Sequence, residues 1–296
     1  MNKEEFYNKL TELLQKRLGE GMKVSRHPVR KNNNVILQGL IIQKQQQNIS
    51  PTIYLEGFFE MYKQKNDMEM IADRILELYE KGCPKKSIDM DFFKDFDKVK
   101  DRIVYRLINA ERNKELLEEI PHILFLDLAI CFYYAFSDEA LGEGIIQIHN
   151  THMKMWQTNH SELMKLAEQN TERLFPAEYL TLSSVIGMDS EEMEEDDSQV
   201  YLHILTNTQR CFGAAGILYR ETLSFIADKL ESGFYILPSS VHEVIIVKDT
   251  GCEDVQNLHD MVTEVNRTQL EQEEILSDYP YYYDKKERKI TRLTEF

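Results

Sequence analysis

The sequence of 296 residues has no closely spaced pair of cysteines. Its four cysteines, at positions 83, 131, 211 and 252, are far apart and lie in or beside apolar stretches. Zinc sites and thioredoxin-like redox sites use pairs of cysteines with two residues between them, and small secreted domains are rich in disulfides. We therefore expect reduced, mostly buried thiols and a cytoplasmic protein.

Long apolar runs and an excess of basic residues are also missing. The most apolar stretch, residues 120–136, carries Asp127 in its middle and is too short to span a bilayer. The first residues are charged and amphipathic, unlike a signal peptide. Lys and Arg number 35 against 51 Asp and Glu, a net charge of -16. Such a surface repels phosphate backbones and anionic membranes. We therefore expect no membrane association, and binding to nucleic acid only where the basic residues gather on one face.

Signatures of cofactors and metals are absent from the chain. It contains no GxxxxGK[ST] motif, and the stretch FGAAG at residues 212–216 lacks the GxGxxG spacing of dinucleotide sites. His149, His152 and His160 lie close together but without the HExxH spacing of zinc proteases. The acidic run at residues 189–197 lacks the spaced ligands and central glycine of a calcium loop. The sequence predicts neither a cofactor nor a metal.

Helical and strand patterns alternate along the chain. Apolar residues recur at helical spacing in residues 3–18, 67–81, 214–230 and 254–273. Short apolar runs predict antiparallel pairs at residues 23–29 with 35–42, 234–237 with 243–247, and 279–283 with 289–293, because their connections are too short for a parallel crossover. Residues 123–134 read as one long buried strand, followed by a strand at 144–149. These patterns predict an α+β fold of mainly antiparallel sheets with helices packed on one face.

Seven carboxylates between positions 189 and 197 interrupt this pattern. A block of like charges repels itself and is typical of a solvated loop. We take it as a boundary between two sub-domains. The predicted division is an N-terminal α+β region at 1–187, an acidic linker or loop at 188–199, and a C-terminal α+β region at 200–296.

Polar residues that could form a ligand or partner site gather in the C-terminal third. Ser239, Ser240 and His242 share one turn, and a serine near a histidine resembles a nucleophile and its base. A nucleophile elbow, however, joins a strand to a helix. Asn207 and Arg210 precede the FGAAG stretch, where the N-terminal amides of a helix can bind an anion. With Asn266 from the next helix, these six residues are either a binding or catalytic site or a set of turns and caps.

The C-terminal end combines tyrosines with basic residues. Tyr279 and residues 281–283 precede five cations at positions 285, 286, 288, 289 and 292. Aromatic and basic side chains together can bind nucleic acid, or they can cover the core and guard the edge of a sheet. The acidic composition favours the edge hairpin, which is also a suitable place for a protein partner.

Four segments resemble a known family. NISPTIYLEGFFEMY (48–62), LINAERNKELLEEIPHILFLDLAICFYY (107–134), LPSSVHEVIIV (237–247) and MVTEVNRTQLEQEEILSDYPYYYD (261–284) are similar to an uncharacterised bacterial family, a domain of unknown function common in gut anaerobes. This resemblance implies a bacterial, cytosolic, stand-alone protein and brings no activity or site residues with it. We expect a non-catalytic binding or regulatory protein that acts through a protein partner. The alternative is an enzyme with an unrecognised site near the turn from Ser239 to His242. The sequence does not tell which small molecule, if any, the protein binds.

Overall fold

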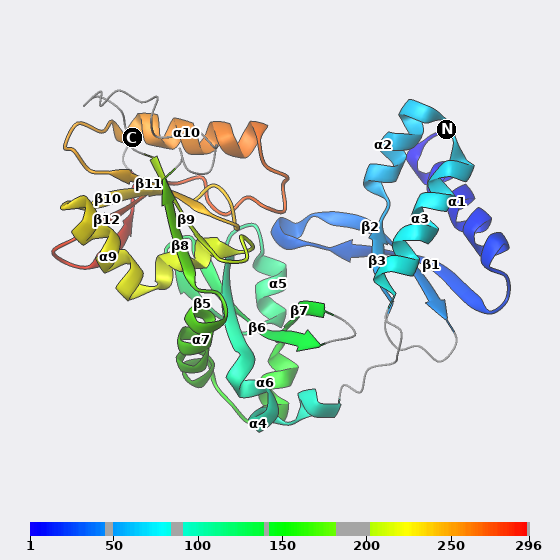
Figure 1. Cartoon of the computed structure of the whole chain (residues 1–296), viewed down its shortest axis with the longest axis horizontal. Coiled ribbons are helices and arrows are strands. Elements are labelled where there is room, and N and C mark those ends of the chain that lie inside the picture. Colours follow the sequence, from blue (N-terminus) through cyan, green and yellow to red (C-terminus); the bar gives the residue numbers. More distant parts are fainter. Residues whose placement is uncertain (45–49, 84–90, 139–141, 182–201, 295–296) are drawn as a thin grey trace. The chain divides into compact units, whose positions relative to one another are not determined.

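The computed structural model describes residues 1–44, 50–83, 91–138, 142–181 and 202–294 (Figure 1). Contacts between Cα atoms divide the chain into two compact units. Unit 1 comprises residues 1–31, 35–92 and 137–144, and unit 2 comprises residues 32–34, 93–136 and 145–296. Helices and mainly antiparallel sheets occur in the described residues, which confirms the predicted α+β class.

The described part of unit 1 contains three α-helices and a three-stranded antiparallel sheet. Its elements are α1 (Lys3–Leu18), β1 (Met22–Arg30), β2 (Ile36–Lys44), β3 (Thr52–Tyr54), α2 (Glu56–Lys65) and α3 (Met68–Gly82). The helical spacing of Phe6, Leu10 and Leu14 places them on one face of α1, where all three are fully buried. They share one core with Leu40 of the sheet and Ile71 of α3.

The first predicted hairpin is confirmed. β1 and β2 pair antiparallel from Met22 with Lys44 to Arg30 with Ile36. The residues between the two strands, Asn32–Asn34, form a 3₁₀ turn that belongs to unit 2. Asn33 and Asn34 have φ of 57° and 58°, a left-handed backbone that asparagine tolerates better than most residues.

The smaller sheet of unit 2 shows where one prediction fails. Its strands are β4 (Ile103–Asn109), β5 (His122–Phe125), β6 (Leu128–Asp138) and β7 (Gly142–Gln147), in the order β4-β6-β5 with β7 also on β6. The single strand predicted at 123–134 is therefore wrong, because β5 and β6 form a hairpin that pairs Phe125 with Leu128. Leu126 makes the turn with φ of 55°. No glycine, proline or asparagine marks this turn, so the apolar sequence hides it.

Helix α7 (His160–Leu174) covers the outer edge of β4 and satisfies its backbone groups. The Tyr105 N–H donates to Thr171 Oγ1 at 3.0 Å, and Asn170 Nδ2 donates to the carbonyl oxygen of Ile103 at 3.0 Å. Both side chains are buried. These two side chains take the place of a neighbouring strand at this edge of the sheet. Without them, buried backbone groups of β4 would lack hydrogen-bond partners, which costs free energy. The short helices α4 (Phe96–Val99), α5 (Lys114–Glu119) and α6 (Asn150–Trp156) complete this part of unit 2.

A six-stranded antiparallel sheet forms the rest of unit 2, with the order β13-β12-β10-β11-β9-β8. Its strands are β8 (Ala177–Thr181), β9 (Leu202–Asn207), β10 (Phe234–Leu237), β11 (Val244–Lys248), β12 (Tyr281–Asp284) and β13 (Lys289–Arg292). The hairpins predicted for 234–247 and 279–293 are both present. The terminal hairpin supplies β13, which forms the edge of the sheet as expected.

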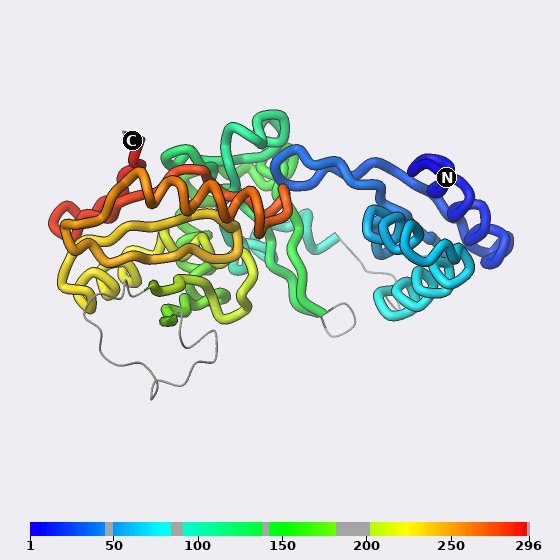
Figure 2. The backbone as a smooth tube through the Cα atoms, turned by 90° about the horizontal axis from the view of Figure 1, so that it is seen from above, coloured from blue at the N-terminus to red at the C-terminus, as the bar shows by residue number. Residues whose placement is uncertain are grey.

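Helices lie on both faces of this larger sheet, whereas we expected one covered face. Leu258 and Val262 of α10 (Val255–Thr268) pack against Leu237 and Val247, which point to one face. Helix α9 (Arg220–Leu230) lies on the opposite side (Figure 2). The helix predicted to start at 214 begins as a separate 3₁₀ helix, η4 (Gly213–Leu218), and α9 follows it.

The compact units do not divide at the acidic run. β8 ends at Thr181 and β9 begins at Leu202, and these two strands pair antiparallel in one sheet. The residues on both sides of the acidic run therefore belong to unit 2, and the units divide at residues 92 and 93 instead. The predicted linker at 188–199 lies outside the described residues.

Candidate functional site

Asn207 builds the turn that follows β9. Its Oδ1 accepts the backbone N–H groups of Gln209 at 3.1 Å and Cys211 at 3.3 Å, and its Nδ2 donates to the Cys211 carbonyl oxygen at 2.9 Å. The side chain is buried. Arg210 lies at the tip of the turn with a mostly exposed side chain, and its Nε is 3.7 Å from Glu178 Oε2. Asn207 is therefore committed to the local backbone, whereas Arg210 faces solvent.

The turn that carries Ser240 and His242 packs directly against this loop. The Gly213 N–H and the Thr206 hydroxyl both donate to the His242 carbonyl oxygen at 2.9 Å. The Phe212 N–H donates to His242 Nδ1 at 3.2 Å, which places the proton of the neutral ring on Nε2. Ser240 Oγ accepts the His242 N–H at 3.0 Å. These polar atoms hold two loops together.

Residues 274–278 run along the other side of the same turn. Across this contact, the backbone N–H groups of Val241, Leu276 and Ser277 donate hydrogen bonds of 2.8–3.0 Å to backbone carbonyl oxygens. Leu276 donates to the carbonyl oxygen of Ser239, and Ser240 forms a β-bridge with Ile275. Ser239 thus contributes its backbone to a short strand-like contact.

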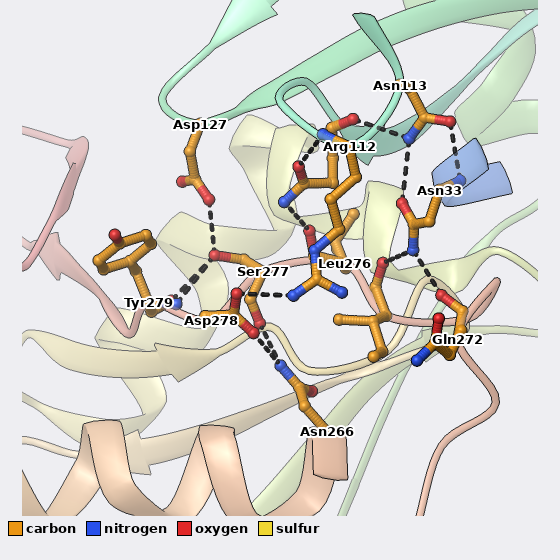
Figure 3. Close-up of polar contacts among 12 residues, drawn as sticks. Asn33, Arg112, Asn113, Asp127, Asn266, Gln272, Leu276, Ser277, Asp278 and Tyr279 are labelled. Atoms are coloured by element: carbon orange, nitrogen blue, oxygen red, sulfur yellow. Dashed lines mark hydrogen bonds and ion pairs between the residues drawn. The ribbon is translucent and has the colours of Figure 1, made fainter. Parts of the chain in front are cut away.

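Asn266 reaches residues 274–278 from α10. Its Nδ2 donates to the Ser277 carbonyl oxygen at 2.9 Å and to Asp278 Oδ1 at 2.8 Å (Figure 3). The other carboxylate oxygen of Asp278 lies 2.7 Å from Arg112 Nη2, and Ser277 Oγ donates to Asp127 Oδ2 at 2.7 Å. Asn266 Oδ1 is buried and has no partner among the described residues.

Five of the six predicted site residues lie in adjoining segments. Asn207, Ser239, Ser240 and His242 meet where the two loops pack, and Asn266 lies beyond residues 274–278. Arg210 is exposed at its turn tip. Their hydrogen bonds go largely to backbone groups, which is what caps and turns require. A role in ligand binding or catalysis for these six residues remains a prediction.

Asn113 and Asn33 are central to the same region, and the sequence analysis missed them. Asn113 is 2 % exposed. Its Nδ2 donates to Asn33 Oδ1 and to the carbonyl oxygen of Asn109, and its Oδ1 accepts the Asn33 N–H (Figure 3). Asn33 Nδ2 then donates to the carbonyl oxygens of Gln272 and Ile275 at 2.7 Å. The sequence indicated only that these asparagines connect the two strands of a predicted hairpin, because the partners of Asn33 are about 80 and 240 residues away in sequence.

Arg106 is a third residue that the sequence analysis missed. It lies on β4 with 9 % of its surface exposed. Its guanidinium carbon is 3.6 Å from the ring centre of Phe212 and 5.2 Å from that of Tyr133. Burial lowers the pKa of Arg106 to about 10. A single arginine inside the apolar run IVYRLIN was the available signal.

A groove of about 700 Å³ opens between the hairpin of β5 and β6, helices α7 and α9, and the terminal hairpin. Leu124 and Leu126 line it and are 66 % and 39 % exposed. Tyr283 and Ile290 of the terminal hairpin are buried beneath it. Its charged residues are Arg220, Arg288, Lys289, Glu168 and Glu221. This groove combines exposed apolar side chains with a charged rim.

The histidines at 149 and 152 serve the start of α6. The His149 N–H donates to His152 Nδ1 at 2.9 Å, and the His152 ring stacks on Trp156. Burial, with a smaller contribution from His149, lowers the pKa of His152. No group of three His, Cys, Asp or Glu residues suited to a metal ion occurs in the described ranges. Within the same ranges, no helix has the length and apolarity needed to cross a membrane.

Comparison with protein families decides where the chain belongs. A family model described as "Family of unknown function (DUF5688)" matches residues 3–285. The chain belongs to this family. The predicted resemblance to a family of unknown function is thereby confirmed, while the bacterial and gut-anaerobe origin stays a prediction. No curated protein and no solved structure matched the chain.

Proposed function

We propose that the protein is a non-catalytic binding protein that holds an extended, acidic and apolar segment of a protein partner. The groove between β5 and the terminal hairpin supports this proposal. Its volume of about 700 Å³ lies within the usual range of binding sites. Leu124 leaves 66 % of its surface in water, and burying such a side chain gives a favourable free energy of about 2 kcal/mol.

Two edge strands border the groove and can extend a sheet. β5 ends the order β4-β6-β5, and β13 ends the order of the larger sheet. Leu124 and Phe125 of β5 and Lys289 and Ile290 of β13 line the groove. An edge strand offers unpaired N–H and C=O groups that an added peptide strand can bond. We therefore propose an extended conformation for the bound segment.

The charges around the groove favour an acidic occupant. Arg220, Arg288 and Lys289 are exposed, and none has an ion pair among the described residues. By contrast, Lys285 of the same hairpin lies 3.3 Å from Asp228 Oδ1. Against the two carboxylates Glu168 and Glu221, these three cations leave the groove with one excess positive charge, in a chain of net charge -16. Carboxylates of a partner would supply the missing charge.

We place this function in the cytoplasm. Cys83, Cys131, Cys211 and Cys252 are free thiols in the structure. Disulfides form and persist in oxidising compartments, whereas thiols stay reduced in the cytosol. The free thiols support a cytoplasmic location.

Selection from a library of random peptides displayed on phage, with the full chain immobilised, tests the proposal. We expect enriched peptides to alternate apolar residues with Asp or Glu. A synthetic peptide of the enriched sequence should bind the native protein, and binding should weaken at least tenfold with Leu124→Asp or with the pair Arg288→Glu and Lys289→Glu.

Lys286→Glu is the matched control, because Lys286 lies in the same hairpin, is exposed and does not line the groove. It makes the same kind of charge reversal at one position, half the change of charge of the pair, and should leave affinity within about twofold, since an exposed charge outside the contact acts mainly through long-range, salt-screened attraction. Enriched peptides that are basic, or that bind the groove variants as well as the native protein, would refute the proposal.

A further inference from the structure

The sheet of unit 1 lies in a part of the chain without acidic residues. Residues 21–55, which include β1, β2 and β3, contain five Lys and Arg, one His and no Asp or Glu. At the average of the whole chain, 51 acidic residues in 296, a stretch of this length would carry about six. This sheet is therefore positively charged within an acidic chain. It belongs to unit 1, whereas the groove lies in unit 2.

The helices of unit 1 pack on one face of this sheet. Leu40, Ile42 and Ile53 point to that face and share a core with α1 and α3. Because successive side chains of a strand alternate between the two faces, their neighbours point to the opposite face. The opposite face carries Lys23, Ser25 and His27 of β1, Ile41 of β2, and Thr52 and Tyr54 of β3. All six of these side chains are at least partly exposed.

The centre of the opposite face is flat and apolar. Gly39 of β2 pairs with His27 on one side and with Tyr54 on the other. A Cβ at Gly39 would lie 2.6 Å from Thr52 Cγ2 and 2.8 Å from Val29 Cγ2, so methyl groups of the outer strands lie across the glycine. The rings of His27 and Tyr54 come from strands two spacings apart, about 10 Å. Such a floor between two rings suits flat aromatic ligands.

Lysines lie at both ends of the opposite face. Lys23 and Lys44 lie at one end of the β1–β2 pair. Lys31 follows the other end of β1, and its Nζ is 4.1 Å from the ring centre of Tyr54. None of the three lysines has an ion pair among the described residues, whereas Arg26, which points to the helices, pairs with a carboxylate of α1. At about 3.3 Å per residue, the strand places Lys23 and Lys31 about 26 Å apart.

We propose that the opposite face of the unit 1 sheet binds single-stranded nucleic acid. Phosphates would contact the lysines at its ends, and bases would stack on the rings of His27 and Tyr54. A length of about 26 Å suits a few nucleotides, at the lower end of the range of about 4–16 that one small domain binds. An added peptide strand needs the backbone groups of a sheet edge, but this face presents side chains, on which any base can stack. Acidic residues more than about 10 Å away are screened at physiological salt.

Fluorescence anisotropy of the full chain with labelled single-stranded RNA and DNA of about 12 nucleotides tests the proposal. Binding of either one supports it. The slope of log affinity against log salt should be about -2, because each of three lysine–phosphate contacts contributes about -0.7. Lys23→Glu with Lys31→Glu should weaken binding at least tenfold. The matched control is Lys9→Glu with Lys16→Glu, which reverses two exposed charges on α1 and should leave affinity within about twofold.

Two further measurements separate stacking from simple attraction of charge. Tyr54→Leu should weaken binding about fivefold or more, since it removes a ring on which a base stacks, and Tyr54→Phe should preserve binding. Ultraviolet cross-linking of the native complex does not depend on any variant, and the cross-links should map to residues 23–31 or 52–54. Polyglutamate should compete poorly with the oligonucleotide, because it has no bases.

Several results would overturn the proposal. They are no binding at about 50 mM salt, equal weakening by the control pair, equal competition by polyglutamate, and cross-links confined to unit 2. Arg288→Glu with Lys289→Glu, which changes the groove, should leave oligonucleotide binding unchanged. Loss of binding in that pair would place the nucleic acid at the terminal hairpin and would also contradict the proposal. The two surfaces are thus tested separately.

Discussion

Replacing Asn113 with alanine should destabilise unit 2 strongly. Asn113 is 2 % exposed and makes three hydrogen bonds, two with Asn33 and one with the Asn109 carbonyl oxygen, at 2.8–3.0 Å. A buried hydrogen bond contributes about 1 kcal/mol net, and a buried group left without its partner costs about 1–3 kcal/mol. We therefore expect Asn113→Ala to lower the free energy of unfolding by about 3 kcal/mol, a large part of the total for a typical domain.

Urea denaturation followed by tryptophan fluorescence measures this effect. The chain has one tryptophan, Trp156, which packs in unit 2 against Phe93 and donates to its carbonyl oxygen at 2.8 Å. The control is Asn150→Ala, because Asn150 makes a single exposed hydrogen bond to the Glu118 carbonyl oxygen. This control should cost less than about 1 kcal/mol. If Asn113→Ala costs no more than the control, the polar residues of Figure 3 do not hold unit 2 together as we argue.

Three further predictions concern backbone packing, pH and thiol access. Gly213→Ala should lower the free energy of unfolding by at least about 2 kcal/mol, because the added Cβ would lie 2.6 and 2.7 Å from backbone atoms of neighbouring segments. Gly57 lies in open space on a helix, so Gly57→Ala should not lower it. Thermal unfolding of both variants measures the difference. Burial lowers the pKa of His203, so the unfolded state binds a proton more readily than the folded state does. The contribution of His203 to the free energy of unfolding should therefore be complete above about pH 6.5 and should decrease as the pH falls below this value. His203→Asn should reduce the slope of this part of a midpoint-against-pH curve, to which His152 also contributes, and His160→Asn, at an exposed position, should not change it. Cys131, which is fully buried, should react with a thiol reagent only at the rate of unfolding, and rapid labelling in native buffer would contradict the structure.

The sequence predicted those parts of the fold that local chemistry specifies. The hairpin of β1 and β2 was recognisable because asparagines in its turn tolerate a left-handed backbone, and the hairpin of β10 and β11 because Pro238 and two serines separate its strands. The turn at Leu126 was missed because its one turn-favouring residue, Asp127, stands alone in an apolar stretch. Apolar residues on both sides then resemble one continuous strand.

The groove could not be predicted, because its walls come from distant parts of the chain. Its lining residues come from within the segments 124–130, 164–168, 217–224 and 283–290, and only the folded chain brings these segments together. The terminal hairpin was expected to be a place for a partner, but its neighbours were unknown. Arg106 shows the same limit, since its contacts with the rings of Phe212 and Tyr133 follow from packing and not from spacing in the sequence.

Hydrogen exchange of the native protein with and without a peptide selected by display tests the central claim most directly. If a partner segment extends the sheets in the groove, backbone amides of β5 (His122–Phe125), of β13 (Lys289–Arg292) or of both should exchange more slowly when the peptide is bound. The same peptide should not change exchange in the pair variant Arg288→Glu and Lys289→Glu. Protection confined to other elements, or no protection at either edge strand with the peptide bound, would contradict the account.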